Sequence, residues 1–219
     1  KDIPTPTPTS DALIFPNSNF EDSIPMTNWN IKASNLGSST INFNSERTNF
    51  NREGNNFLGT GEDAEGVNDE WKMDVRSNAF IIDNTRIGDF IRFLLGGGLY
   101  SEVALKVPNS DEKYTNRVKV SLMVSTTVSP LPNPVDDDYT TGPANYSEVD
   151  FGNPSSGKMG DTMEYHYWPI DNSKILQGNT SVAAYIRITD DSIRPSFGHI
   201  NVDDFRWVSA TPSPGTLNQ

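Results

Sequence analysis

The chain has 219 residues, with 17 Lys or Arg against 29 Asp or Glu, so its formal net charge is −12. Nucleic-acid phosphates are bound by clustered basic side chains, so this balance argues against a nucleic-acid partner. The absence of Cys and the presence of only two His, His166 and His199, exclude disulfides, Cys-ligated zinc and a multi-His metal site. No apolar run approaches the roughly 18 residues that span a membrane, so we expect no membrane span.

Two tails rich in Pro, Thr and Ser enclose the part of the sequence that we expect to fold. Residues 1–10 alternate Thr with Pro, which prevents helix formation and favours an extended spacer. Residues 210–219 have a similar composition and are expected to form a flexible tail. Ordinary frayed termini would have the same composition. The chain length fits one large β-domain or two small domains, and we expect one folded body at residues 11–209.

Between the tails, apolar residues alternate with polar ones or come in short runs, which indicates strands. No window longer than about ten residues has a helical apolar stripe without Gly, Pro or Asn in it. Short strands separated by turn signals predict an all-β fold, an antiparallel β-sandwich or jelly roll. In chain order, the strands are expected at residues 80–82, 90–95, 103–107, 118–124, 182–188 and 199–208.

Two segments are predicted to be long loops, residues 47–71 and residues 129–160. Structureless stretches of this length in a compact domain are usually functional or disordered. The second loop contains Tyr139 and Tyr146 and an acidic run at residues 136–138, which is more often solvated than cation-binding.

Three segments together resemble a known family. Residues 15–21, followed by Trp29, resemble the N-x-x-F-E…W start of β-jelly-roll carbohydrate-binding modules. Residues 88–98 are similar to the strand and Gly-rich loop of the galactose-binding-like fold, as carried by modules attached to fructan-degrading and related glycoside hydrolases. Residues 197–205 resemble the W-G-H-I-n-v-D-d-i ending of the same group, with Phe197 where Trp is usual. The resemblance implies a galactose-binding-like jelly roll.

The resemblance also implies a structural Ca²⁺ at the edge of the sandwich. Its ligands would be Glu21, one of Asp203 and Asp204, and loop carbonyls. Hard carboxylate and carbonyl oxygens suit Ca²⁺, which takes six to eight of them. Strand alternation predicts that Asp203 and Asp204 point to opposite faces. The alternative is that these acids are solvated or pair with Arg206.

Sugar rings bind to aromatic faces, and sugar hydroxyls bind to planar polar side chains. Tyr100 follows the Gly-rich loop, and Asp191 and Arg194 lie in a polar loop before the last strand. Related modules bind sugar on loops at one end of the sandwich, so we expect these three residues to meet there. Trp168 is a further candidate for stacking. It ends the run Tyr165-His166-Tyr167-Trp168, in which alternation places at least one face in the core.

The function expected from these observations is non-catalytic binding of an extracellular polysaccharide or oligosaccharide, by a monomer. One alternative is an adhesive or structural sandwich that binds a protein partner through residues 129–160. Another is a jelly-roll glycan lyase or hydrolase. A hydrolase needs two carboxylates about 5–10 Å apart, and no motif nominates such a pair. His166 lacks a Ser/His/Asp pattern around it.

The tail composition is typical of spacers on exported bacterial proteins. We therefore expect an extracellular location or one on the outer cell surface. A Cys before Lys1 in a precursor would add a lipid anchor, because Lys1-Asp2 resembles the charged start of surface lipoproteins that forage for glycans.

Overall fold

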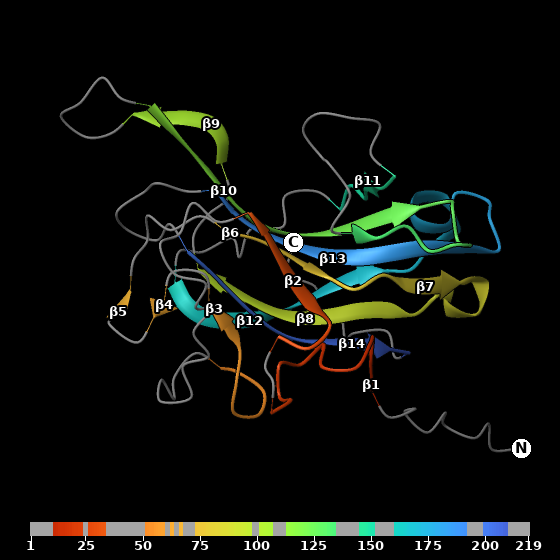
Figure 1. The fold of residues 1–219 in the computed structure, drawn as a ribbon, viewed down its shortest axis with the longest axis horizontal. Coiled ribbons are helices and arrows are strands. Elements are labelled where there is room, and N and C mark those ends of the chain that lie inside the picture. The colour runs from red at the N-terminus through yellow and green to blue at the C-terminus, as the bar shows by residue number, and fades with distance from the viewer. Residues whose placement is uncertain are drawn as a thin grey trace, which may run out of the picture.

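The fold is an antiparallel β-sandwich, seen in a computed structural model as two layers of strands (Figure 1). Nearly all described residues lie in strands or in the turns between them, so the predicted all-β sandwich is confirmed. The structure describes residues 11–23, 26–33, 51–59, 62–63, 66–67, 73–97, 101–106, 113–134, 145–151, 160–191 and 199–209.

One layer is a five-stranded sheet in which every pairing is antiparallel. Its order is β1 (Ala12–Leu13), β14 (Ile200–Val208), β8 (Phe90–Gly97) and β12 (Gly160–Pro169), with β3 (Leu58–Gly59) also beside β14. Among the described residues β12 pairs only with β8 and forms an edge of this sheet.

The other layer is a seven-stranded antiparallel sheet. Its order is β11 (Ser147–Glu148), β10 (Lys113–Ser125), β13 (Ser181–Asp191), β6 (Met73–Ser77) and β2 (Trp29–Ala33), while β7 (Phe80–Asp83) also pairs with β13 and β9 (Ser101–Lys106) with β10. A separate pair is formed by β4 (Glu62–Asp63) and β5 (Gly66–Val67).

The first described strand pairs with the last. Ala12 lies opposite Trp207, and Leu13 lies opposite Arg206. This pairing brings the beginning and the end of the described β-structure side by side.

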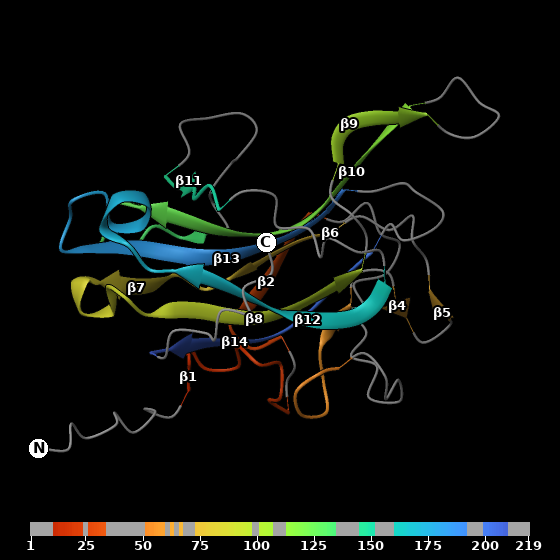
Figure 2. The ribbon, with the colours of Figure 1, turned by 180° about the vertical axis from the view of Figure 1, so that it is seen from behind.

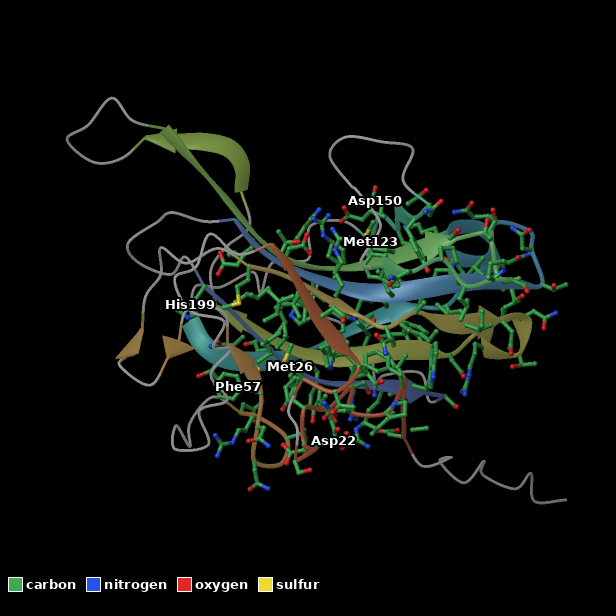
Figure 3. All side chains as sticks on the ribbon, viewed as in Figure 1. Asp22, Met26, Phe57, Met123, Asp150 and His199 are labelled. Atoms are coloured by element: carbon green, nitrogen blue, oxygen red, sulfur yellow. The ribbon has the colours of Figure 1, made fainter. Side chains whose placement is uncertain are left out.

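The core lies between the two sheets, where apolar side chains of alternating residues meet (Figure 3). Aromatic rings form its centre. Phe93 of β8 stacks on Phe205 of β14 at 5.2 Å, and Trp29 of β2 stacks on Phe20 at 4.8 Å. Trp29 joins the two layers, because it belongs to β2 of one sheet and its ring also reaches Phe205 of the other.

Two short helical turns have both ends among the described residues. They are η1 (Asn84–Arg86) and η3 (Asn172–Leu176). Each begins at an aspartate, Asp83 or Asp171, whose side chain accepts a hydrogen bond from a backbone N–H of the turn. Within the described part of the chain no helix is long and apolar enough to cross a membrane.

The outer face of the seven-stranded sheet carries a buried ion cluster, defined as Asp74, Arg76 and Arg187. The carboxylate of Asp74 accepts two hydrogen bonds from Arg76, at 3.1 and 2.9 Å, and two from Arg187, at 3.0 and 2.7 Å. Arg76 also donates to the carbonyl of Pro134 at 2.7 Å. The cluster therefore fixes one end of the predicted 129–160 loop onto this sheet.

A second anchor of the same loop is Tyr146, whose ring meets Tyr185 edge-on at 4.7 Å. Its hydroxyl donates to the carbonyl of Pro132 at 2.7 Å. Close by, Lys119 and Ser121 of β10 both hydrogen-bond Glu148 of β11. The described parts of this loop are thus packed on the sheet, and the side chain of Tyr146 is buried.

Candidate functional site

The outer face of the five-stranded sheet is distinguished by the side chains that β8 and the edge strand β12 present. On β8, Ile91 and Phe93 point into the core, so Phe90 and Arg92 point to the outer face. On β12, Trp168 belongs to the core. The alternation of the strand therefore turns Tyr167 outward.

These outward side chains form an aromatic row, defined as Phe90, Tyr167 and Tyr165. The ring of Phe90 meets that of Tyr167 at 6.3 Å with an angle of 87°, and Tyr165 follows at 6.5 Å from Tyr167 with an angle of 45°. All three are half-buried. Figure 2, which shows the molecule from behind, has β8 and β12 side by side.

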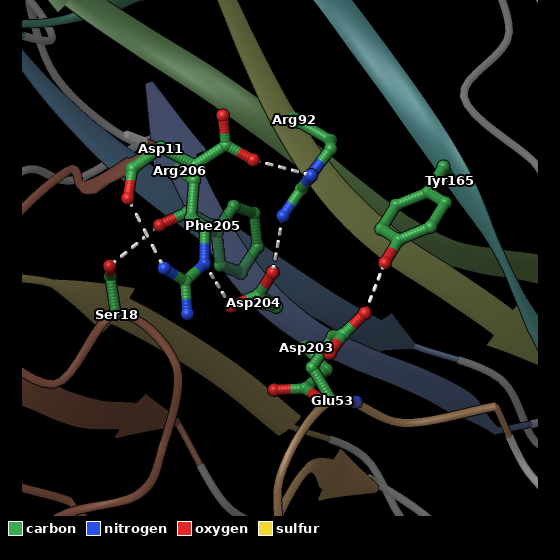
Figure 4. Close-up of polar contacts among 9 residues, drawn as sticks. All are labelled: Asp11, Ser18, Glu53, Arg92, Tyr165, Asp203, Asp204, Phe205 and Arg206. Carbon is green, nitrogen blue, oxygen red and sulfur yellow. Dashed lines mark hydrogen bonds and ion pairs between the residues drawn. The ribbon is translucent and has the colours of Figure 1, made fainter. Parts of the chain in front are cut away.

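Arg92 lies between the aromatic row and a group of acids (Figure 4). Its guanidinium carbon is 4.8 Å from the centre of the Tyr165 ring, within range of a cation–π contact. The same guanidinium donates to Asp11 at 2.7 Å and to Asp204 at 2.9 Å. Asp204 also accepts from Arg206 at 2.6 Å. Arg92 is therefore held in one orientation against the aromatic row.

Tyr165 is also tied to the segment at residues 51–56. Its hydroxyl donates a hydrogen bond to the carboxylate of Glu53, an exposed residue. Partial burial, followed by this hydrogen bond and the charge of Glu53, raises the pKa of Tyr165 well above its usual value. The hydroxyl thus stays protonated at neutral pH and serves as the donor.

A β-bulge places Asp203 and Asp204 on the same face of β14. Val202 and Phe205 both point into the core, so two residues lie between core positions where regular alternation has one. The pairing with β8 shifts register between Asp203 and Arg206, and Asp204 has a left-handed φ of 55°. The prediction that the two aspartates point to opposite faces is therefore wrong.

The carboxyl group of Asp203 is fully buried, and one of its two oxygens lacks a hydrogen-bond partner among the described residues. Its Oδ2 accepts a hydrogen bond from the backbone N–H of Glu53 at 2.9 Å. Its Oδ1 has no hydrogen-bond partner among the described residues. Burial raises the pKa of Asp203 to about 9, against the lowering effect of the Glu53 N–H, and the carboxylates of Asp204 and Glu21 add to the rise.

Glu21 contacts the same 51–56 segment. Its Oε1 accepts from the backbone N–H groups of Asn55 at 2.8 Å and Asn56 at 2.6 Å. Gly54, directly before Asn55, has a φ of 71°, and a Cβ on it would lie 2.7 Å from the Glu21 carboxylate carbon. The left-handed backbone conformation favours glycine here, and a side chain would push the Glu21 carboxylate from its position. We call Glu21 and Asp203 the acid pair.

The acid pair has the chemistry of a partial calcium site. A divalent cation could bind the unpartnered buried oxygen of Asp203 and the carboxylate of Glu21, which is close enough to raise the pKa of Asp203. In the part of the chain that is described, no three acidic or His side chains gather around one metal position. A cation would thus need backbone or amide oxygens as further ligands, which Ca²⁺ accepts. Asp204 is instead paired with Arg92 and Arg206, the latter being the alternative left open by the sequence.

The residues that the sequence nominated for sugar contact lie mostly outside the described part of the chain. Tyr100 and Arg194 are outside it, as is Tyr139. Asp191 is the last residue of β13, and its backbone lies opposite that of Arg117 in the neighbouring strand β10. Their expected meeting at one end of the sandwich stays a prediction.

Trp168, the expected stacking residue, is packed in the core and is 4% exposed. Its ring is stacked on Phe151 at 5.1 Å, with the two planes 6° apart, and contacts Phe93 at 4.5 Å. A sugar could reach the ring only if these neighbours moved. Its burial therefore favours a packing role over the sugar contact expected from the sequence.

His166 shares the inner face of β12 with Trp168, as the alternation of this segment predicted. Its ring stacks on Phe93 at 5.6 Å, and its Nε2 has no hydrogen-bond partner among the described residues. Burial lowers the pKa of His166, so the ring is neutral at pH 7. This environment is that of a packed side chain.

Sequence reasoning missed the outward face of the same strand. The run Tyr165-His166-Tyr167-Trp168 contained the necessary signal, because assigning Trp168 to the core turns both tyrosines outward. The contribution of Glu53 had no such signal, since its contact with Tyr165 joins residues 112 positions apart.

No protein-family model matches the chain, and no curated protein matches it in sequence. A structural similarity exists to the solved structure of TmCBM61 in complex with beta-1,4-galactotriose. The two chains are 14% identical, and the TM-score is 0.44. The similarity covers 89% of this chain and 97% of the other.

Proposed function

We propose that this protein binds a polysaccharide or oligosaccharide without cleaving it, and that the aromatic row is its binding surface. The observation that carries the proposal is the row itself, with Arg92 and Glu53 beside it. Aromatic faces suit the C–H groups of a sugar ring, while a guanidinium donates to hydroxyls and a carboxylate accepts from them. Tyrosine hydroxyls serve both purposes.

The angles within the aromatic row favour a soluble glycan chain over a crystalline surface. A flat crystalline polysaccharide needs coplanar rings to stack on, whereas these rings are inclined by 87° and 45° to their neighbours. Inclined rings suit sugars that turn relative to one another along the chain.

A non-catalytic role is supported by the environment of Asp203. Its raised pKa is what a general acid would need, but the side chain is fully buried and covered by the backbone of Glu53. A scissile glycosidic oxygen would not reach it.

The proposal includes a structural Ca²⁺ held by the acid pair and by oxygens near residues 51–56. The cation would neutralise the buried carboxylate of Asp203, which stabilises the folded state because the unfolded chain lacks the site. At a free concentration 100 times the dissociation constant, the gain would be about 2.7 kcal/mol. Excess chelator should then lower the melting temperature, and an unchanged melting curve together with no metal in elemental analysis would count against the site.

We also propose that the protein is a monomer that works outside the cell or on its outer surface. The support is the tail composition described above, and a precursor sequence would test it. A cleavage signal ending in Cys would support lipid anchoring, while the absence of any export signal would contradict the location.

Affinity gel electrophoresis tests the binding function directly. The gels would contain plant, algal and fructan polysaccharides and a β-1,4-galactan. Retardation by one of them is expected for the wild type and for Ile81→Ala, which changes an exposed side chain on the opposite sheet. Tyr165→Ala and Tyr167→Ala should each lose most of the retardation.

The possible results separate the alternatives. No retardation by any polysaccharide would refute carbohydrate binding. Normal retardation of both tyrosine variants would move the site to the loops of Tyr100, Asp191 and Arg194. Release of reducing sugar from a retarding polysaccharide would establish an enzyme instead.

A further inference from the structure

The segment at residues 51–56 contacts both the acid pair and the aromatic row. Toward the acid pair, three of its backbone N–H groups are donors: Asn55 and Asn56 to Glu21, and Glu53 to Asp203. Toward the aromatic row, the side chain of Glu53 accepts from Tyr165. One residue, Glu53, thus touches the acid pair with its backbone and the aromatic row with its side chain.

Two residues of the segment have left-handed backbone conformations. Gly54 has a left-handed φ of 71°, which glycine adopts freely, whereas the left-handed φ of 58° at Asn51 must be held by the surroundings of that residue. A further described hydrogen bond runs from the side chain of Asn51 to the backbone carbonyl of Met163 at 2.9 Å. A change at Glu21 and Asp203 therefore acts on the conformation of the segment.

We infer that cation binding at the acid pair and polysaccharide binding at the aromatic row are positively coupled, with Glu53 as the positioning residue between them. The inference rests on the proposed function for its polysaccharide part. A cation between Glu21 and Asp203 would hold the two carboxylates that anchor the segment. Glu53 would then keep Tyr165 in one position, and the sugar would meet a preformed surface without touching the metal.

The geometry of Tyr165 explains why its position matters for binding. The ring has Arg92 over it and the Glu53 carboxylate at its hydroxyl, so two contacts define its orientation. If the carboxylate moves away, the hydroxyl loses its acceptor and the ring is free to turn. A ring that must be ordered by the sugar lowers the affinity, because the cost of ordering is then part of binding.

The first experiment uses Ca²⁺ alone and needs no sugar. The full-length chain is stripped with chelator, and its tyrosine ultraviolet difference spectrum is recorded as Ca²⁺ is added. We expect a tyrosine signal that saturates together with calorimetric Ca²⁺ binding. The signal should vanish in Tyr165→Phe and in Glu53→Ala, while Glu53→Gln, which keeps an acceptor oxygen, should retain it.

Tyr167→Phe is the matched control. It removes a hydroxyl from the same face of the same strand, but from a ring whose contacts are to Phe90 and Tyr165 and not to Glu53. It should therefore keep the signal. Equal signals in Tyr165→Phe and the wild type, absence of any tyrosine signal at saturating Ca²⁺, or absence of Ca²⁺ binding would each overturn the inference.

The second experiment measures the coupling itself with soluble β-1,4-galactan and inulin as probes. Saturating Ca²⁺ should strengthen binding of the retained probe by at least about fivefold, and by linkage that probe should strengthen Ca²⁺ binding equally. In Glu53→Ala both factors should fall to one, although Ca²⁺ still binds, because the backbone N–H to Asp203 remains. A structural role of Glu53 alone would lower stability without changing this factor.

The two experiments distinguish failure of the inference from failure of the proposed function. If neither probe binds but the Glu53-dependent tyrosine signal appears, the carbohydrate function fails for these glycans, while the link from the acid pair to Tyr165 is supported. If a probe binds equally with Ca²⁺ and with chelator, the coupling is overturned and the carbohydrate function stands.

Discussion

Replacing Asp203 by Asn should stabilise the calcium-free protein while abolishing its response to calcium. Asp203 is fully buried, and burial raises its pKa to about 9. In the unfolded chain the group has its ordinary pKa of 3.8 and is ionised at neutral pH. Folding without a cation must therefore protonate this carboxyl, and that protonation opposes folding.

The size of the effect follows from the two pKa values. Protonating the carboxyl at pH 7 costs about 4 kcal/mol, at about 1.4 kcal/mol for each of the roughly three pH units above 3.8. Asn keeps the acceptor for the Glu53 N–H but places an amide N–H₂ where Oδ1 lies, and leaving it unpaired costs about 1–3 kcal/mol. The net stabilisation by Asp203→Asn at pH 7 is thus about 1–3 kcal/mol.

The raised pKa of Asp203 also predicts the direction in which calcium-free stability changes with pH. An acid whose folded pKa is raised destabilises the fold once the unfolded group ionises, so calcium-free stability should fall from about pH 4 towards about pH 9. The difference between Asp203→Asn and the wild type should therefore grow with pH, by about 4 kcal/mol between pH 5 and pH 8.

Urea unfolding in chelator at pH 5 and pH 8 measures both proteins under the same conditions. Comparing the two proteins removes the contributions of other titrating groups. A variant that is less stable than the wild type at pH 8, or a difference that does not change with pH, would refute the reasoning. Added Ca²⁺ should reverse the order, because only the wild type can bind it with this carboxylate.

Three further predictions concern other parts of the molecule. Asp74→Asn should destabilise by about 3–5 kcal/mol in urea unfolding, because it leaves two buried guanidinium groups without their carboxylate. Although burial opposes it, the hydrogen bonds from Arg187 and then Arg76 lower the pKa of Asp74, so the stability that this group contributes should be lost as the pH falls below about 4. Trp168→Ala should lower stability by about 3–5 kcal/mol, and a thermally normal variant with weaker polysaccharide binding would contradict its packing role. Tyr100→Ala and Arg194→Ala should each weaken polysaccharide binding by about 1–2 kcal/mol in calorimetry if the loop site is used, and normal binding by both would leave the aromatic row as the site.

Strand alternation allowed most of the fold to be predicted from the sequence. The expected runs at residues 90–95, 182–188 and 199–208 lie within or overlap β8, β13 and β14. β6 was not predicted, although the run Met-Asp-Val-Arg within it alternates apolar and polar side chains. Its charged residues, Asp74 and Arg76, are buried beneath a distant segment that no local pattern reveals.

The candidate site was harder to predict for two physical reasons. Strand alternation assumes one residue between core positions, and the bulge at Asp203 and Asp204 inserts a second one. The contacts of Glu53 with Asp203 and Tyr165 are also long-range, and spacing along the chain cannot predict them. The alternation of Tyr165 and Tyr167 was local, and it correctly separated one face of β12 from the other.

The pairing of β1 with β14 means that the folded body starts and finishes at one point. Ala12 and Trp207 are directly opposite in an antiparallel pair, so their Cα atoms are about 5 Å apart. A domain built this way can be inserted into a loop of another protein or circularly permuted with little strain. Joining Ser209 to Asp11 by a short Gly-Ser linker, with new ends opened elsewhere, should therefore preserve the sandwich. In any longer polypeptide, the flanking segments would leave the body at neighbouring points, about which the proposed binding surface could reorient.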